Sequence, residues 1–249
     1  MSHNEEHVRR LVQWGRQDRG EAAIGRSPIR SVGILGAGMM GTAIAAAHLQ
    51  HRVPVVICDV KEDVLAGAID AVAAELHKAQ VELPPEIFRR LVRSTADLAE
   101  AARCDLVLES IPESLPLKRT LFSQLHGRLN ADTIVTSNTS TIPIGRLADS
   151  VPDASRFCGM HFFHPVHQRP LVEIVRGPQS SERTIAEVIT HVKNMGWIPL
   201  VVSDGPGFVV NRLLFPYLSE SLQLLREGIR AEVIERLRLS LAWPWGRCG

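Results

Sequence analysis

Short runs rich in apolar residues alternate with longer amphipathic segments from Ser31 onward. The apolar runs occupy 31–35, 53–59, 104–111, 133–140, 156–163, 171–175 and 198–204. Such runs are typical of strands that are covered on both faces of a sheet. The spacing of amphipathic helices is found between them, at 42–50, 62–80, 84–92, 115–129 and 182–196. Strands that alternate with helices predict an α/β fold with a doubly wound, mostly parallel sheet.

The pattern changes after residue 204. The segments 209–229 and 231–243 both have helical spacing, with no strand between them. Residues 1–29 are polar and rich in Arg and Gln. We therefore predict a leader or linker at 1–29, a doubly wound α/β domain at 30–204 and the start of an all-α domain at 205–249.

The composition narrows the class of protein. The 249 residues are 45% apolar and 22% charged, with a net charge of +1, which gives no electrostatic case for nucleic acid or an anionic membrane. No apolar run reaches the ~18 residues that a membrane span needs, and the N-terminus lacks the apolar core of a signal peptide. The four cysteines form no CxxC pair, so we expect reduced thiols in a cytoplasmic protein.

The segment "GAGMMG" has the spacing G-x-G-x-x-G and lies between a predicted strand and a predicted helix. In this context the glycines of a Rossmann-type fold allow a tight turn, the approach of a pyrophosphate and close helix–strand packing. The next strand ends in Asp59, whose carboxylate can bind ribose hydroxyls and would repel a 2′-phosphate, which favours NAD over NADP. The candidate cofactor-binding residues here are Gly36, Gly38, Met39, Met40, Gly41 and Asp59.

Three histidines, His161, His164 and His167, are spaced three residues apart in "GMHFFHPVHQRPLVEIV". A metal site is disfavoured, because residues three apart in an extended segment point to opposite faces and Pro165 excludes a regular helix. A catalytic base with an orienting carboxylate is a second hypothesis. Glu173 is costly to bury unless it is paired, and His161 ends a strand, where such sheets bind ligands. A structural histidine is the third alternative.

Four motifs extend the picture: "GILGAGMMG", "SNTSTIPI", "GMHFFHPVHQRPLVEIVRG" and "GPGFVVNRLLFPYL". With these four motifs in this order, the sequence resembles the L-3-hydroxyacyl-CoA dehydrogenases from about residue 29 to about residue 246. It is most similar to the dehydrogenase part of the bacterial multifunctional fatty-acid oxidation alpha subunit. The resemblance implies NAD-dependent oxidation of (S)-3-hydroxyacyl-CoA to 3-ketoacyl-CoA in β-oxidation, with an acyl-CoA as the substrate partner.

The resemblance also implies catalytic roles. His161 matches the base that takes the hydroxyl proton, and Glu173 matches its carboxylate partner. Ser140 and Asn211 match residues that bind the reacting oxygen. A hydroxyl, an amide and an imidazolium would together stabilise a developing alkoxide.

Three further matches concern the cofactor. Asn138 matches a position near the nicotinamide, and Glu113 and Lys118 match positions that line the cofactor and the mouth of the cleft. Two of them have a plainer alternative: Asn138 as a turn or N-cap residue and Lys118 as a solvated helix residue.

The sequence departs from the family in two places. His164 stands where the family usually has Asn, in a position expected to pack beside the catalytic histidine, which changes local polarity. The sequence ends soon after "AWPWG", so we expect a truncated helical domain that forms a homodimer or binds a complementing helical partner. Two alternative functions follow: a non-catalytic NAD-binding module, or a dehydrogenase of free 3-hydroxy acids on the same fold.

Overall fold

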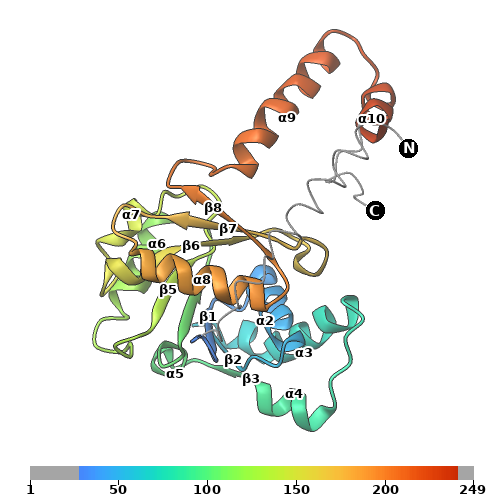
Figure 1. Ribbon diagram of the computed structural model, residues 1–249. Coiled ribbons are helices and arrows are strands. Elements are labelled where there is room, and N and C mark those ends of the chain that lie inside the picture. Colours follow the sequence, from blue (N-terminus) through green and yellow to red (C-terminus); the bar gives the residue numbers. More distant parts are fainter. Residues whose placement is uncertain (1–27, 241–249) are drawn as a thin grey trace. The chain divides into compact units, whose positions relative to one another are not determined.

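The computed structural model describes residues 28–240, with side chains for 28–237 (Figure 1). Most of the predicted leader, and Cys248, lie outside the described residues. The chain divides into two compact units, whose described parts are residues 28–208 and 209–240.

The first unit is built on one eight-stranded sheet with the strand order β3-β2-β1-β4-β5-β6-β7-β8. The strands are β1 Val32–Leu35, β2 Val55–Cys58, β3 Val92–Thr95, β4 Leu106–Glu109, β5 Ile134–Ser137, β6 Phe157–Phe162, β7 Leu171–Arg176 and β8 Ile198–Ser203. Neighbouring strands from β3 to β6 are parallel, whereas β7 is antiparallel to β6 and parallel to β8. The sheet reverses its order of addition at β1 and β4, which is the switch point where doubly wound folds bind ligands.

Helices cover both faces of this sheet (Figure 1). One apolar cluster joins the sheet to α2 Met39–Gln50, α3 Glu62–Lys78 and α8 Glu182–Asn194. A second cluster, on the other face, joins it to α5 Leu98–Ala102, α6 Leu115–Ser123 and α7 Gly145–Ala148. The remaining helices of this unit are α4 Pro85–Leu91 and the 3-10 turns η1 Ala154–Arg156 and η2 Val166–Gln168. The prediction of a doubly wound Rossmann-type sheet is confirmed.

The edge strand β3 and the helix α5 were not predicted. We assigned Val92 to the end of a helix and no element to the residues after it, whereas the helix ends at Leu91 and β3 follows at once. The sequence "VRST" is short and half polar because β3 is an edge strand, so it lacks the continuous apolar run of the inner strands.

The second unit contains α9 Val210–Arg226 and α10 Ala231–Ser240. The helical segment predicted after residue 204 is thus present in the described residues. Several large apolar side chains of α9 are exposed, among them Leu213 (64%), Phe215 (57%) and Leu222 (62%). Within residues 28–240, no helix combines the length and the apolar character that crossing a bilayer would require.

Candidate active site

The antiparallel pairing of β6 and β7 places His161 directly opposite Glu173. Nδ1 of His161 lies 2.8 Å from Oε2 of Glu173. Because a carboxylate only accepts, Nδ1 carries the hydrogen and donates it. The two residues are 4% and 0% exposed, so the carboxylate is withdrawn from water and the imidazole is held in one tautomer. The structure thus brings together the two residues that the sequence analysis paired.

The other ring nitrogen of His161 faces Ser140. Nε2 lies 3.1 Å from the Ser140 hydroxyl oxygen, and since Nδ1 carries the hydrogen of the neutral ring, the hydroxyl donates to Nε2. The rings of Phe163 and Phe208 lie against the imidazole, with centroid distances of 4.5 and 5.7 Å. The arrangement presents one basic nitrogen and one hydroxyl, both positioned by their neighbours, at the carboxyl end of β6.

The loop that carries Ser140 is held by a single carboxylate, that of Glu113. Its Oε1 accepts hydrogen bonds from the Thr139 hydroxyl (2.6 Å), the Ser140 N–H (3.1 Å), and the Thr141 N–H and hydroxyl (3.0 and 2.9 Å). Burial opposes the charged form of Glu113, but the hydrogen bonds from Thr139 and Thr141 and the charge of Lys118 outweigh it and lower the pKa of this carboxyl. Glu113 is therefore ionised at neutral pH and fixes the loop.

The ammonium group of Lys118 contacts the carboxylates of Glu113 and Glu109. Its Nζ lies 2.6 Å from Glu109 Oε1, 3.3 Å from Glu113 Oε2 and 3.2 Å from the Ile111 carbonyl. Burial raises the pKa of Glu109, although Lys118 and the Ser137 hydroxyl, which donates to Oε2 at 2.5 Å, counter it. Lys118 is only 1% exposed, so it is a buried partner of two carboxylates and not a solvated helix residue. Its predicted contact with a cofactor stays a prediction.

The glycine turn between β1 and α2 has the geometry that the motif predicts. Gly36 has a φ of 111°, in the left-handed region that favours glycine. A Cβ at Gly41 would overlap the carbonyl oxygen of Gly36, whereas a Cβ at Gly38 would meet nothing within 4 Å. The backbone at Gly38 is thus open to an approaching group, and the first turn of α2 offers N–H groups without intrahelical acceptors. This turn fits the pyrophosphate of a dinucleotide.

Asp59, at the end of β2, closes this turn. Its Oδ2 accepts from the Ala37 N–H at 2.8 Å and its Oδ1 from the Lys61 N–H at 3.1 Å. Each carboxylate oxygen has a further lone pair, so the side chain can still accept from ribose hydroxyls. Of the two methionines at the start of α2, Met39 is 64% exposed and Met40 is half-buried.

Asn138 lies beside His161, whereas the other two histidines of the motif have no role in the hydrogen bonds of His161. Asn138 Oδ1 accepts from the Phe162 N–H at 2.8 Å, which ties the end of β5 to β6 beside His161. His164 is exposed, and His167 lies in η2 with Nε2 3.1 Å from the Gln168 amide nitrogen. Among the described residues, no three His, Cys, Asp or Glu side chains are grouped as ligands of a metal ion.

The sequence matches two family models. Residues 31–205 match the NAD binding domain of 3-hydroxyacyl-CoA dehydrogenase, and residues 207–249 match the C-terminal domain of the same enzyme. The chain belongs to the 3-hydroxyacyl-CoA dehydrogenase family. Its cofactor is NAD, in agreement with the glycine turn and Asp59.

Solved structures of dehydrogenases are similar to this family member. The (S)-3-hydroxybutyryl-CoA dehydrogenase of Ralstonia eutropha is 35% identical, with a TM-score of 0.80 over 87% of this chain and 79% of that one. The 3-hydroxybutyryl-CoA dehydrogenase of Escherichia coli is 32% identical, with a TM-score of 0.75 over 82% and 44%. An NAD-dependent 5-dehydrogenase of a pyridine carboxylic acid is 32% identical, with a TM-score of 0.77 over 87% and 71%.

Some residues of this dehydrogenase site were missed in the sequence, and one lies in the other unit. Glu109, Thr139 and Thr141 were not predicted, although Glu109 ends an apolar strand "LVLE", where an acid must find a buried partner. Asn211 is the second residue of α9 and belongs to the second unit, so its predicted contact with the reacting oxygen stays a prediction.

Proposed function

We propose that the chain oxidises (S)-3-hydroxyacyl-CoA to 3-ketoacyl-CoA with NAD, or catalyses the reverse reaction, with His161 as the general base. The observation that carries this proposal is the Glu173–His161–Ser140 chain of hydrogen bonds, with distances of 2.8 and 3.1 Å, in which the carboxylate and the imidazole are buried. A base held by a buried carboxylate and aimed at a hydroxyl is what the removal of a proton from an alcohol requires. The family match and the hydroxybutyryl-CoA dehydrogenases among the solved structures support the acyl-CoA class.

Glu173, His161 and Ser140 have different roles in the proposed reaction. Nε2 of His161 accepts the proton of the substrate 3-hydroxyl, and the imidazolium that forms is stabilised by Glu173, which accepts from Nδ1 throughout. The Ser140 hydroxyl, already 3.1 Å from Nε2, donates to the substrate oxygen as negative charge develops on it. In the reverse direction, the imidazolium returns its proton to the ketone oxygen.

Bound NAD supplies the hydride acceptor. The C3–H bond then breaks with its electron pair while the O–H bond gives its proton to His161, so that the alcohol becomes a ketone and one proton is left on the protein. The rings of Phe163 and Phe208 cover the imidazole and limit the access of water to it.

The experiment is an NADH-consumption assay with acetoacetyl-CoA on the full chain, beside His161→Gln and the matched control His126→Gln, whose side chain is exposed. Turnover that is lost in the first variant and kept in the second supports the proposal. NADH binding without turnover in the unmodified chain would instead identify a non-catalytic NAD-binding module.

The choice of substrate class needs its own comparison. The pyridine carboxylic acid dehydrogenase among the similar structures shows that relatives of this identity act on substrates of other kinds. Assays with acetoacetyl-CoA and free acetoacetate side by side decide the class. A higher kcat/KM for the free acid would overturn the acyl-CoA assignment and leave the dehydrogenase assignment in place.

We also propose that the exposed apolar side chains of α9 bind a second copy of the chain. Phe215 and Leu222 are 57% and 62% exposed and lie about two turns apart on one face of α9, and an exposed apolar helix face is typical of an interface. Sedimentation velocity should show a dimer that dissociates in the Phe215→Lys/Leu222→Lys variant, and a monomeric parent chain would rule this out.

A further inference from the structure

A cavity of about 350 Å³ lies at the amino ends of the strands, whereas the glycine turn lies at their carboxyl ends. Buried residues such as Val55 and Leu91 form its floor, and exposed arginines at the ends of α4 and α5 form its rim. The lining residues are Ser31, Pro54, Val55, Val56, Arg89, Arg90, Leu91, Val92, Arg93, Glu100, Arg103 and Cys104. Its volume falls in the range of about 300–1,000 Å³ that is typical of small-molecule sites.

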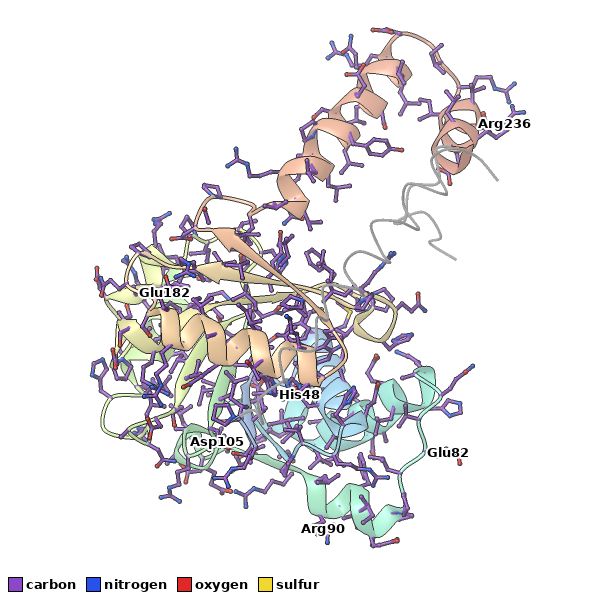
Figure 2. All side chains as sticks on the ribbon, in the orientation of Figure 1. His48, Glu82, Arg90, Asp105, Glu182 and Arg236 are labelled. Carbon is purple, nitrogen blue, oxygen red and sulfur yellow. The ribbon has the colours of Figure 1, made fainter. Side chains whose placement is uncertain are left out.

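Four arginines line this cavity against one carboxylate. Arg89 and Arg90 come from the last turn of α4, Arg93 from β3 and Arg103 from the end of α5 (Figure 2 labels Arg90). Glu100 pairs with Arg93 at 3.3 Å. Within residues 28–240, the guanidinium groups of the other three arginines form neither a hydrogen bond nor an ion pair. The chain as a whole carries a net charge of only +1, so this excess of positive charge is local.

The helix dipole explains the positions of only some of these four arginines. A basic side chain in the last turn of a helix is stabilised by the helix dipole, which explains the positions of Arg89, Arg90 and Arg103 one by one. It explains neither Arg93, which lies on a strand, nor the hollow that all of them line. Three exposed guanidinium groups without a partner among the described residues line one concave surface, and guanidinium groups bind phosphate oxygens through paired N–H donors.

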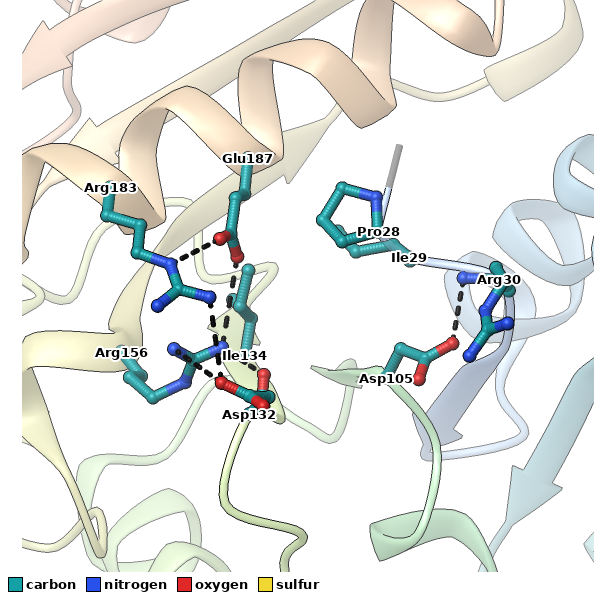
Figure 3. A pocket seen from close by; sticks show the side chains of 9 residues that line it. All are labelled: Pro28, Ile29, Arg30, Asp105, Asp132, Ile134, Arg156, Arg183 and Glu187. Carbon is teal, nitrogen blue, oxygen red and sulfur yellow. Dashed lines mark hydrogen bonds and ion pairs between the residues drawn. The ribbon is translucent and has the colours of Figure 1, made fainter. Parts of the chain in front are cut away.

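A neighbouring cavity along the same edge provides the contrast (Figure 3). It measures about 260 Å³, and its lining includes three arginines and three carboxylates, those of Arg30, Arg156, Arg183, Asp105, Asp132 and Glu187. There two arginines and two carboxylates pair with one another: Arg183 pairs with Glu187 at 2.6 Å and with Asp132 at 3.6 Å, and Arg156 contacts the same two carboxylates at 3.8 Å. This cavity therefore holds a network of ion pairs, whereas the four-arginine cavity holds one ion pair, between Arg93 and Glu100.

We propose that the four-arginine cavity binds an organic anion with two or more phosphate groups. The phosphates contact Arg89, Arg90 and Arg103 at the rim, and the organic part covers the apolar floor formed by Val55 and Leu91. The site is separate from the proposed reaction, because it lies at the opposite ends of the strands from the glycine turn and Asp59. A nucleoside triphosphate has the matching charge and an apolar planar body.

Calorimetric titration of the NAD-saturated full chain with ATP and with inorganic tripolyphosphate tests this inference. Saturation with NAD blocks the cofactor site, so any binding that remains lies elsewhere. The test variant is Arg89→Gln/Arg103→Gln. The control, Arg128→Gln/Arg226→Gln, removes the same charge from exposed arginines outside the cavity. NADH affinity, measured on all three proteins, reports whether each one is folded.

We expect ATP to bind with one-to-one stoichiometry, to bind more tightly than tripolyphosphate, and to lose about tenfold in affinity in the test variant but not in the control. A weaker interaction at higher salt should accompany this. Equal losses in both double variants, or no binding at NAD saturation, would overturn the proposal. Tighter binding of a poly-glutamate peptide than of ATP would assign the cavity to an acidic protein surface instead.

Discussion

Replacing Glu173 by glutamine removes one charge from the proposed active site and almost no volume. The side chain is fully buried and lies directly opposite His161 in the β6–β7 ladder, so the substitution leaves the packing intact. The glutamine oxygen can still accept from Nδ1 at the observed 2.8 Å. What is lost is the attraction between a carboxylate and the imidazolium that forms when the substrate proton is transferred.

The size of this loss follows from the geometry. With charge centres about 4 Å apart and an effective dielectric constant of about 20, the attraction is about 4 kcal/mol. The hydrogen bond that glutamine retains returns part of it, so we expect the transition state to lose about 2–4 kcal/mol. This corresponds to a kcat that is about 30- to 1,000-fold lower.

The assay is steady-state reduction of NAD with (S)-3-hydroxybutyryl-CoA, the direction in which His161 accepts the substrate proton, paired with NADH titration by fluorescence. NADH affinity should be unchanged, because Glu173 does not contribute to the glycine turn. A loss of kcat below about threefold, in a variant that folds and binds NADH normally, would falsify the role assigned to the carboxylate.

The remaining predictions concern the loop, the cofactor turn and the core. Glu113→Gln should lower kcat about tenfold or more with little change in stability of the sheet, because the loop that positions Ser140 loses its ionised acceptor; the readout is kcat against NADH affinity, and an unchanged kcat contradicts it. Gly41→Ala should destabilise the fold by about 1–3 kcal/mol and weaken NADH binding, since its Cβ overlaps the Gly36 carbonyl; urea unfolding and NADH titration measure both, and an unaltered midpoint argues against it. Burial lowers the pKa of His48 from 6.5 to about 4, so the unfolded chain takes up the proton first as the pH falls. The free energy of unfolding is therefore unaffected by the protonation of His48 above pH 6.5 and falls by up to about 3 kcal/mol as the pH is lowered to 4. Urea unfolding across this pH range should show this fall, and the fall should be smaller in His48→Gln.

The parts of the fold that the sequence predicts are those with a strong period. The inner strands are continuous apolar runs because helices cover both faces, and this pattern is visible in the letters alone. β3 and α5 span only four and five residues, and α5 depends on an Asp97 side chain that accepts from the Ala99 N–H at 2.9 Å. Short elements of this kind are stabilised by their contacts with the sheet, and the local sequence alone does not predict them.

The site shows the same division. The pairing of His161 with Glu173 follows from two local facts, a histidine at a strand end and an acid inside an apolar strand, and the structure brings them within 2.8 Å. The four hydrogen bonds that Glu113 accepts join residues 26 to 28 positions apart in the sequence. Only the parallel packing of β4 beside β5 brings those loops together, so the role of this carboxylate could not be derived from spacing.

His161 and Glu173 are neighbours across two strands, so the chain that connects the strands does not set the distance between the two side chains. The ladder sets their separation, and a register slip of one residue in either strand would turn one of the two side chains to the other face of the sheet, so the pair is protected by every apolar contact that fixes the register. The segment that joins β6 to β7 is a connection outside the ladder, and connections tolerate insertion and replacement. Its exposed residues His164 and Gln168 are therefore open to redesign while the acid–base pair keeps its geometry, provided that the buried Phe163 and Val166 are kept.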